Sequence, residues 1–309
     1  MHELDVARHS SLIDPALHVW GWEIPVYLFL GGMAAGIMVL TALLRGRPGA
    51  PSRALRWLGL AAPALVTLGM AALLLDLANR AHVYRFYLAL RPASPMSWGA
   101  WILLVVYPVT LLAWLGGLEE PEVEALAVRA GPAAGPLRSA RALAVSRSGS
   151  VRRATLASGV ALGVYTGILL STLGARALWN SALLGPLFLA SGVSTGGAFL
   201  LLFPLPDGER HEVGRWHRWA VGIEVVLLAL FLVGLVTGGT ASRDAAGLLL
   251  GGPYTAPFWA LVVVAGLGVP SLLEVFERRL RLRPTLVAPA LVLLGGLALR
   301  WILVVAGQA

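Results

Sequence analysis

The protein has 309 residues, of which 58% are hydrophobic and only 13% are charged, and its mean hydropathy is +0.78. A soluble domain carries about 25% charged residues, so a sequence of this composition cannot cover itself with polar surface in water. A water-soluble protein is therefore excluded. The composition predicts an all-α integral membrane protein that crosses the bilayer several times.

The charged and metal-ligating residues exclude several function classes. The net charge of +8 is the difference between 24 basic residues, all arginine, and 16 acidic residues. The arginines lie in short clusters between apolar spans, which is typical of membrane topology signals. Nucleic acid is therefore not expected as a partner. Cysteine is absent, so the protein holds no iron–sulfur cluster of its own. The histidines fall at or outside the ends of the apolar spans, which disfavours haem held between helices: His2, His9, His18, His82, His211 and His217.

Eight segments are long and apolar enough to cross a hydrocarbon core, which needs roughly 20 residues per helix. In sequence order they are residues 22–44, 58–79, 98–116, 154–175, 181–203, 219–239, 256–276 and 286–306. Arginines gather in the first, third, fifth and seventh connections between these spans. Because positive residues favour the cytoplasmic side, both termini are expected on the outer side.

The long connection, residues 117–153, begins acidic and becomes rich in Arg, Ser and Gly, and we expect a flexible cytoplasmic linker. The predicted organisation is an outer N-terminal segment (1–21), three helices (22–116), the linker, a fourth helix (154–175) and four further helices (181–306). Gly-x-x-x-Gly patterns occur in the first span, at Gly32 and Gly36, and in the fifth, at Gly192 and Gly196. Such patterns permit close helix approach, and their repetition favours two four-helix bundles.

Four ionisable residues fall within or at the ends of the spans: Asp76, Glu224, Glu274 and Arg300. Such residues cost about 2.5–3.5 kcal/mol on insertion scales and persist mainly where they face a partner, a cavity or a pathway. Asp76 can pair with Arg80 one helical turn away, and Arg300 can reach the interface or pair with Asp76. For Glu224 and Glu274, a proton path and a structural role both stay open.

Aromatic and hydrogen-bonding residues gather at the predicted outer rim: His18, Trp20, Trp22, Glu23, Tyr27, Trp98, Trp101, Trp179 and Asn180. Membrane anchoring explains most of the tryptophans. Tyr165 lies midway along the fourth span, and a buried tyrosine needs a partner for its hydroxyl. Hydrogen-bonding groups, flat aromatic walls and a nearby proton carrier are also what a quinone head group requires.

Two runs of sequence are distinctive: Leu-Asp-Leu at 75–77 and Arg-Pro-Ala-Ser-Pro-Met-Ser-Trp-Gly-Ala-Trp at 91–101. They resemble the signature of NrfD/PsrC-type membrane subunits, which belong to polysulfide reductase and related respiratory complexes. The first helix, the Trp179-Asn180 turn and the ending around Arg300 are similar as well. The resemblance implies an eight-helix protein of the bacterial cytoplasmic (inner) membrane that exchanges electrons with menaquinone or ubiquinone near the outer face. It further implies a ferredoxin-like iron–sulfur partner subunit, often bound to a molybdopterin catalytic subunit.

On the family pattern, Tyr165 matches a quinone-contacting tyrosine and Asp76 matches an acidic position of the second helix. The residues expected to act on the quinone and its protons are Tyr165, Asp76 and His18. The expected quinone-binding residues are Tyr27, Glu23, Trp98, Trp101, Arg80, Asn180 and Arg300. Glu224 and Glu274 are expected to extend a proton path, and no metal site is expected.

Two other classes stay open at this point. A secondary transporter or proton channel of two parallel repeats would carry midplane polar groups at matching positions in both halves. A passive membrane anchor would only hold a partner, and quinone turnover in the complex would then survive Tyr165→Phe and Asp76→Asn.

Overall fold

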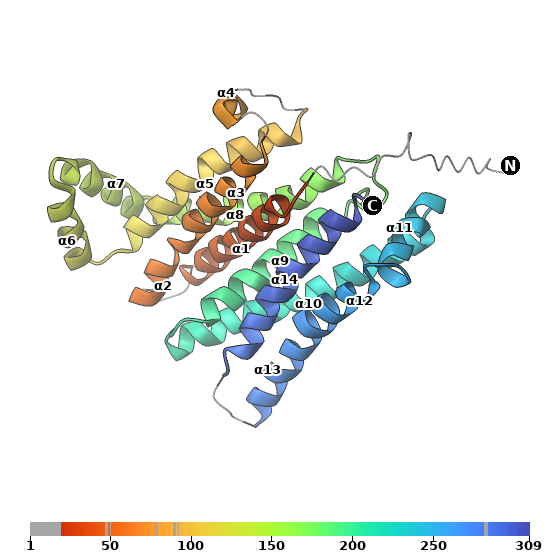
Figure 1. Ribbon diagram of the computed structural model, residues 1–309. Helices are drawn as coiled ribbons and strands as arrows, with labels where there is room; N and C mark the ends of the chain where they lie inside the picture. The colour runs from red at the N-terminus through yellow and green to blue at the C-terminus, as the bar shows by residue number, and fades with distance from the viewer. Residues whose placement is uncertain are drawn as a thin grey trace.

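The computed structural model of the protein describes residues 20–46, 49, 51–77, 80–88, 91, 93–280 and 284–309. Within these ranges every regular element is a helix, and the long helices run side by side (Figure 1). The candidate His18 lies outside the described residues. The helices are α1 (Glu23–Leu44), α2 (Arg53–Leu58), α3 (Ala61–Asp76), η1 (Arg80–His82), α4 (Arg85–Leu88), α5 (Pro95–Gly117), α6 (Glu120–Ala130), η2 (Gly131–Ala133), α7 (Ala134–Ser146), α8 (Ser148–Ser171), α9 (Leu184–Leu201), α10 (Asp207–Thr237), α11 (Thr240–Leu250), α12 (Thr255–Pro257), the π-helix η3 (Phe258–Gly268), α13 (Val269–Arg279) and α14 (Val287–Ala306).

Eight stretches within the described residues are long and apolar enough to cross a membrane, as predicted. They are Glu23–Leu44, Arg53–Asp76, Pro95–Gly117, Ser148–Ser171, Leu184–Leu201, Asp207–Thr237, Thr255–Arg279 and Val287–Ala306. The sixth begins well before the predicted residue 219, because its polar first turns are helical too. Asp207 and Glu209 lie in the first turn of α10, where negative charge stabilises a helix N-terminus.

Two helices form the centre of the molecule. α1 packs against α3, α8, α9 and α14, and α9 packs against α1, α8, α10 and α14. α5 lies against α8, and η3 lies against α14. The division into two four-helix bundles stays a prediction, because α1 and α9, one from each expected bundle, pack as closely together as either does with its own group.

Glycines bring the backbones of α1 and α9 into direct contact. A Cβ at Gly36 would overlap the carbonyl oxygen of Gly192, and a Cβ at Gly196 would lie 2.7 Å from the carbonyl carbon of Gly36. The two Gly-x-x-x-Gly patterns of the sequence therefore pack against each other. In a membrane, where lipid is as apolar as the side chains, such close packing is a main source of helix association.

The two ends of the bundle differ in charge. We call the end that carries Arg45, Arg56 and Arg141 the Arg-rich end, and the opposite end, where Trp20 and the C-terminus lie, the terminal end. The two segments that meet at the terminal end are joined by hydrogen bonds from the Trp20 amide to Gln308 Oε1 (2.8 Å) and from Gln308 Nε2 to the Trp20 carbonyl (3.1 Å).

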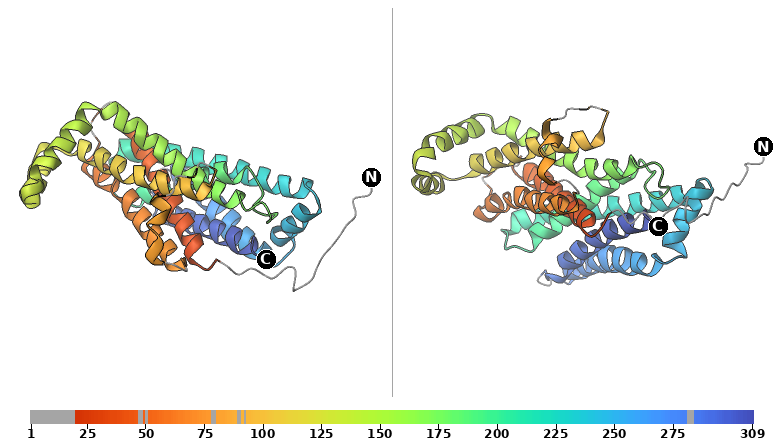
Figure 2. Two further views of the ribbon diagram at one scale, coloured as in Figure 1. Left: turned by 90° about the horizontal axis from the view of Figure 1, so that it is seen from above. Right: turned by 45° about the horizontal axis from the view of Figure 1, so that its top comes forward.

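The expected flexible linker, residues 117–153, is largely helical: besides η2 and the first turn of α8 it contains α6 and α7, which project beyond the Arg-rich end (Figure 2). A capping box formed by Glu119 and Glu122 starts α6, and this arrangement satisfies backbone N–H groups that a helix start leaves unpaired. Arg56 ties α6 to α2 through Glu119 (2.8 Å) and Glu122 (3.3 Å). Burial acts to raise the pKa of Glu122, but hydrogen bonds from Glu119 and Trp57 and the charge of Arg56 lower it below its ordinary value.

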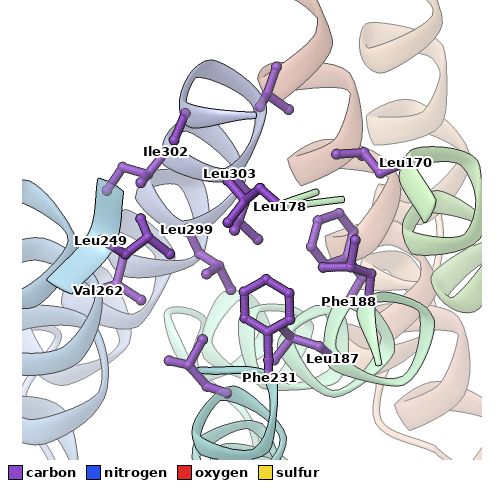
Figure 3. Packing of buried hydrophobic residues seen from close by; sticks show 14 of the residues in the cluster. Leu170, Leu178, Leu187, Phe188, Phe231, Leu249, Val262, Leu299, Ile302 and Leu303 are labelled. Atoms are coloured by element: carbon purple, nitrogen blue, oxygen red, sulfur yellow. The ribbon is translucent and has the colours of Figure 1, made fainter. Parts of the chain in front are cut away.

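A large apolar cluster fills the terminal-end half between α8, α9, α10, α11, η3 and α14. Figure 3 shows its side chains converging from these elements, among them Leu170, Leu178, Leu187, Phe188, Phe231, Leu249, Val262, Leu299, Ile302 and Leu303. A second cluster joins α1, α3, α5 and α9 towards the Arg-rich end. These clusters hold the helices that carry the candidate site in fixed positions.

Candidate functional site

A cavity of about 500 Å³ lies between α1, α3, α5 and α8 in the terminal-end half. Its walls are mainly apolar, and η1 and α4 follow α3 beside it. Polar side chains enter it from different elements: Tyr27 from α1, Asp76 from α3, Tyr87 from α4, Ser94 before α5, and Tyr165 and Thr172 from α8 and its end. An apolar cavity of this size with a few convergent polar groups is the usual form of a small-molecule site.

Two tyrosines form the polar centre of this cavity. Tyr27 and Tyr165 are both buried, and their hydroxyls are hydrogen-bonded to each other. Two hydroxyls carry two protons and the mutual bond uses one, so the other stays available to a ligand. Gly99 makes this arrangement possible, because a Cβ at that position would overlap the Tyr165 hydroxyl.

Asp76 is the last residue of α3 and lies at the rim of the cavity with its side chain half-buried. The carboxyl group of Glu23, at the start of α1, acts on Asp76 electrostatically. The ion pair with Arg80 that the sequence allows does not form between these two described residues, and Arg80 Nη2 donates to the Leu75 carbonyl instead (2.7 Å). The reason is that α3 ends at Asp76, so a spacing of four residues no longer places both side chains on one helix face.

The expected aromatic walls lie elsewhere. Trp98 and Trp101 are 44% and 40% exposed on the outer surface of α5, and neither lines the cavity. Gly99, Ala100 and Leu103 of the same helix line it instead. Because α5 starts at Pro95 and runs unbroken through the motif, positions 98 and 101 share a face that points away from Tyr165.

Three other candidates on the terminal end also lie outside the lining of the cavity: Arg80, Glu23 and Asn180. Asn180 is exposed in the turn after α8. Its neighbour Trp179 is buried, stacks on Trp20 with ring centroids 5.2 Å apart, and donates from Nε1 to the Leu303 carbonyl (2.7 Å). Trp20 lines the cavity, so this aromatic pair supports part of the cavity wall near the terminal end.

Tyr87 of α4 lines the cavity and lies outside the membrane-spanning segments. Burial raises the pKa of its phenol, and the nearby Tyr107 raises it further. The hydroxyl of Tyr87 therefore stays protonated over the physiological range and can donate a hydrogen bond into the cavity.

Arg300 lies in a separate buried cluster between α9, α10 and α14. Its side chain has 0% exposure, and Nη1 donates to Ser191 Oγ (2.9 Å) and to the Gly296 carbonyl (2.9 Å). The guanidinium also lies 5.2 Å from the ring centroid of Phe188. Gly32 of α1 leaves room for it, because a Cβ there would lie 2.7 Å from Nη2.

Glu224 belongs to the same cluster. It is buried, accepts a hydrogen bond from Ser194 Oγ (2.6 Å), is hydrogen-bonded to Ser191 and is the charge that faces Arg300. Ser191 therefore lies between an acidic and a basic side chain from different helices. This arrangement satisfies charges that would be very costly alone in a membrane protein interior.

Glu274 lies nearer the Arg-rich end and contacts a buried histidine. His217 Nε2 is 3.2 Å from Glu274 Oε1, and His217 Nδ1 is 2.8 Å from the Ser194 carbonyl oxygen. Both ring nitrogens thus face oxygen atoms, and His217 links Glu274 of α13 to the backbone of α9. Glu274 also lines a cavity of about 330 Å³ at the Arg-rich end, together with Arg218.

Sequence reasoning does not single out His217, Ser191, Ser194 or Gly99. The hydropathy pattern puts His217 at the edge of a span, but α10 begins earlier than predicted and His217 is buried within it. The two serines form part of a small-residue pattern that indicates helix packing. In the sequence, the one sign of this polar cluster is that Ser191 and Ser194 are three residues apart and lie beside glycines.

The arrangement suits a flat, mainly apolar ligand with hydrogen-bonding oxygen atoms. The Tyr27–Tyr165 pair can hold such an oxygen, and Asp76 at the rim can take or deliver a proton. Among the residues that the structure describes, no group of three or more His, Asp or Glu side chains is placed to hold a metal ion.

Comparison with known proteins gives consistent matches along the whole sequence. The family model described as polysulphide reductase, NrfD, matches residues 9–309. Protein NrfD of Escherichia coli (strain K12) is 33% identical over 303 residues, which cover 94% of this protein and 95% of that one. The C subunit of the polysulfide reductase of Wolinella succinogenes is 31% identical, with 94% of both proteins covered, and an NrfD homologue of Haemophilus influenzae is 29% identical. With eight candidate membrane-spanning helices and these matches, the protein belongs to the NrfD family of polysulfide reductase-type membrane subunits.

Proposed function

We propose that this protein is the quinone-reactive membrane subunit of a respiratory oxidoreductase complex. It would exchange electrons between the quinone pool and an iron–sulfur partner subunit. The observation that carries the proposal is the apolar cavity in which Tyr27, Tyr165 and Asp76 meet. Family membership agrees with it, since one relative is named as part of a polysulfide reductase.

Each polar group has a distinct role in this proposal. The Tyr165 hydroxyl donates a hydrogen bond to one carbonyl oxygen of the head group, and Tyr27 orients Tyr165 through their mutual bond. Asp76 passes protons between that oxygen and water at the terminal end. A bound quinone supplies the redox chemistry, in which two electrons and two protons separate it from its quinol.

The electrons must come from or go to another protein, because the sequence has no cysteine to hold an iron–sulfur cluster. The cavity opens in the terminal-end half, so we place a ferredoxin-like partner at that end, with a molybdopterin subunit bound to it. The arginine distribution supports an orientation with the Arg-rich end in the cytoplasm of a bacterium and the terminal end outside the inner membrane.

The buried polar groups towards the Arg-rich end support a proton route as a second part of this function. Protons would enter at the cavity beside Glu274, pass to His217 and reach Glu224 beside the Ser194 hydroxyl. Turnover would then move charge across the membrane.

Quinone binding by the purified complex tests the first part. We expect extraction to recover stoichiometric quinone, and Tyr165→Phe to weaken binding of a quinol analogue that quenches Trp fluorescence. Gly99→Ala should weaken it as well, because the new methyl displaces the Tyr165 hydroxyl. Tyr254→Phe, in the other half, is the control. If Tyr165→Phe and Gly99→Ala bind and turn over like the control, the cavity is not the quinone site, and a passive anchor is favoured.

Charge movement in liposomes tests the second part. Glu224→Gln keeps the volume and a hydrogen-bonding partner for Ser194, but it cannot carry a proton. We expect quinol turnover to continue with less charge translocated per quinol. Unchanged charge per quinol would exclude the route through Glu224, whereas charge movement without any quinol would favour a proton channel or transporter.

A further inference from the structure

The cavity has an opening between two helices that hardly touch. α3 packs along α1 and α5 packs along α8, whereas α3 and α5 make little direct contact. The cavity separates them: Met70 and Leu74 of α3 line one wall, and Met96 and Leu103 of α5 line the other. α1 and α8 form its floor.

This opening faces the lipid. Leu74 and Met96 line the cavity and are also 38% and 55% exposed on membrane-spanning helices. A side chain that touches both the cavity and the outer surface of a span marks a lateral passage. Apolar residues at that passage suit a hydrocarbon tail, which needs no hydrogen-bonding partner there.

One hydrogen bond joins the two helices at the edge of the passage nearer the Arg-rich end. Thr67 Oγ1 of α3 lies 2.9 Å from the Tyr107 hydroxyl of α5. Thr67 donates its own proton to the Pro63 carbonyl (2.8 Å), so Tyr107 is the donor in the pair. Thr67 is one turn beyond Met70, and Tyr107 is one turn beyond Leu103, so the bond lies directly past the end of the cavity.

Tyr107 lies beside a proline inside α5, so its hydrogen bond affects how the helix bends. Pro108 follows it inside α5, and a proline in a helix interior removes one backbone hydrogen bond and allows the helix to bend. The Tyr107–Thr67 bond therefore holds α5 to α3 at the point where α5 bends most easily. The part of α5 that lines the cavity lies on the other side of that point.

We propose that the gap between α3 and α5 is a lateral portal for a lipid-embedded quinone with a long isoprenoid tail. The Thr67–Tyr107 bond fixes the width of this portal. The proposal rests on the proposed quinone function of the cavity. It makes Thr67 and Tyr107 positioning residues that act on passage of the tail, and it leaves binding of the head group to Tyr27 and Tyr165.

Kinetics of the assembled complex in liposomes, with a tail-less quinol and a long-tailed quinol, test the proposal. Tyr107→Phe and Thr67→Val each remove the bond with little change of volume. We expect KM for the long-tailed quinol to rise by about three- to tenfold, the range of one interhelical hydrogen bond in a membrane, with the tail-less quinol unchanged. Thr237→Val is the matched control, since the Thr237 hydroxyl donates to Val233 of its own helix.

A second pair of changes fills the portal instead of loosening it. Leu74→Trp with Met96→Trp should slow the long-tailed quinol at least about tenfold more than the tail-less one. Equal effects on both quinols, or no effect on either, would overturn the portal. Wild-type complex that turns over neither quinol would instead refute the quinone function itself, so the two failures are distinguishable.

Discussion

The Arg300–Glu224 cluster allows a direct measurement of how much a charge pair stabilises this membrane protein. Arg300 is fully buried, and Glu224, across Ser191 from it, is the acidic group that acts on it electrostatically. Glu224→Leu would leave a guanidinium without a counter-charge, and breaking a buried pair in this way costs about 3–5 kcal/mol. For a protein of this size that corresponds to a fall in Tm of about 6–10 °C, at about 2 °C per kcal/mol.

A double-mutant cycle separates the interaction energy between the two side chains from the stability lost when each is replaced alone. Glu224→Leu and Arg300→Met should each be strongly destabilising, and the double variant should be more stable than Glu224→Leu alone, because no unpaired charge remains. Thermal unfolding in nanodiscs, followed by Trp fluorescence, provides the measurement. The exposed pair Arg138–Glu124 on the projecting helices (3.0 Å) is the control cycle, with an expected coupling below about 1 kcal/mol. If the stability losses of the two single variants simply add up in the double variant, the two side chains do not form a charge pair.

Three further predictions concern the scaffold. Gly36→Leu should cost at least about 3 kcal/mol or prevent assembly, since no space exists for a side chain at the α1–α9 contact; wild-type Tm would contradict this. Trp179→Phe should lower stability by about 1–3 kcal/mol because the Leu303 carbonyl loses its indole donor, and a Tm unchanged within error would count against that bond. The pKa of Glu122 is lowered in the folded protein, so its stabilising contribution is present above the ordinary carboxyl pKa of about 4.3 and is lost as pH falls below it. The stability difference between wild type and Glu122→Gln, which weakens the Arg56 pairing, should therefore shrink on acidification, and a difference independent of pH would contradict it.

The spans can be predicted because hydrophobic length is a one-dimensional property of the sequence. Polar helices that continue beyond the bilayer cannot be recognised in this way, which is why α10 starts at Asp207 instead of residue 219 and why 117–153 contains α6 and α7. Ala-rich sequence and the acidic residues at the start of α6 are the local signals for those helices.

The site is predictable only in part, for a similar reason. Tyr27, Asp76 and Tyr165 line one cavity, as the combination of rim position and resemblance suggests. The side of α5 that faces them depends on the rotation of that helix, and the prediction for Trp98 and Trp101 places them on the wrong face. The pairing of Glu274 with His217 requires two helices to be placed in space, which no spacing within either helix reveals.

The glycine contact between α1 and α9 limits the ways in which this protein can work. Transporters that alternate between two open faces rock one half of the molecule against the other. Here such a motion would have to separate backbones that touch at Gly36, Gly192 and Gly196, at the centre of the molecule. The close packing at these glycines opposes such a rocking motion. With α1 and α9 held together, coupling between the terminal end and the Arg-rich end would travel as protons and side-chain rearrangements.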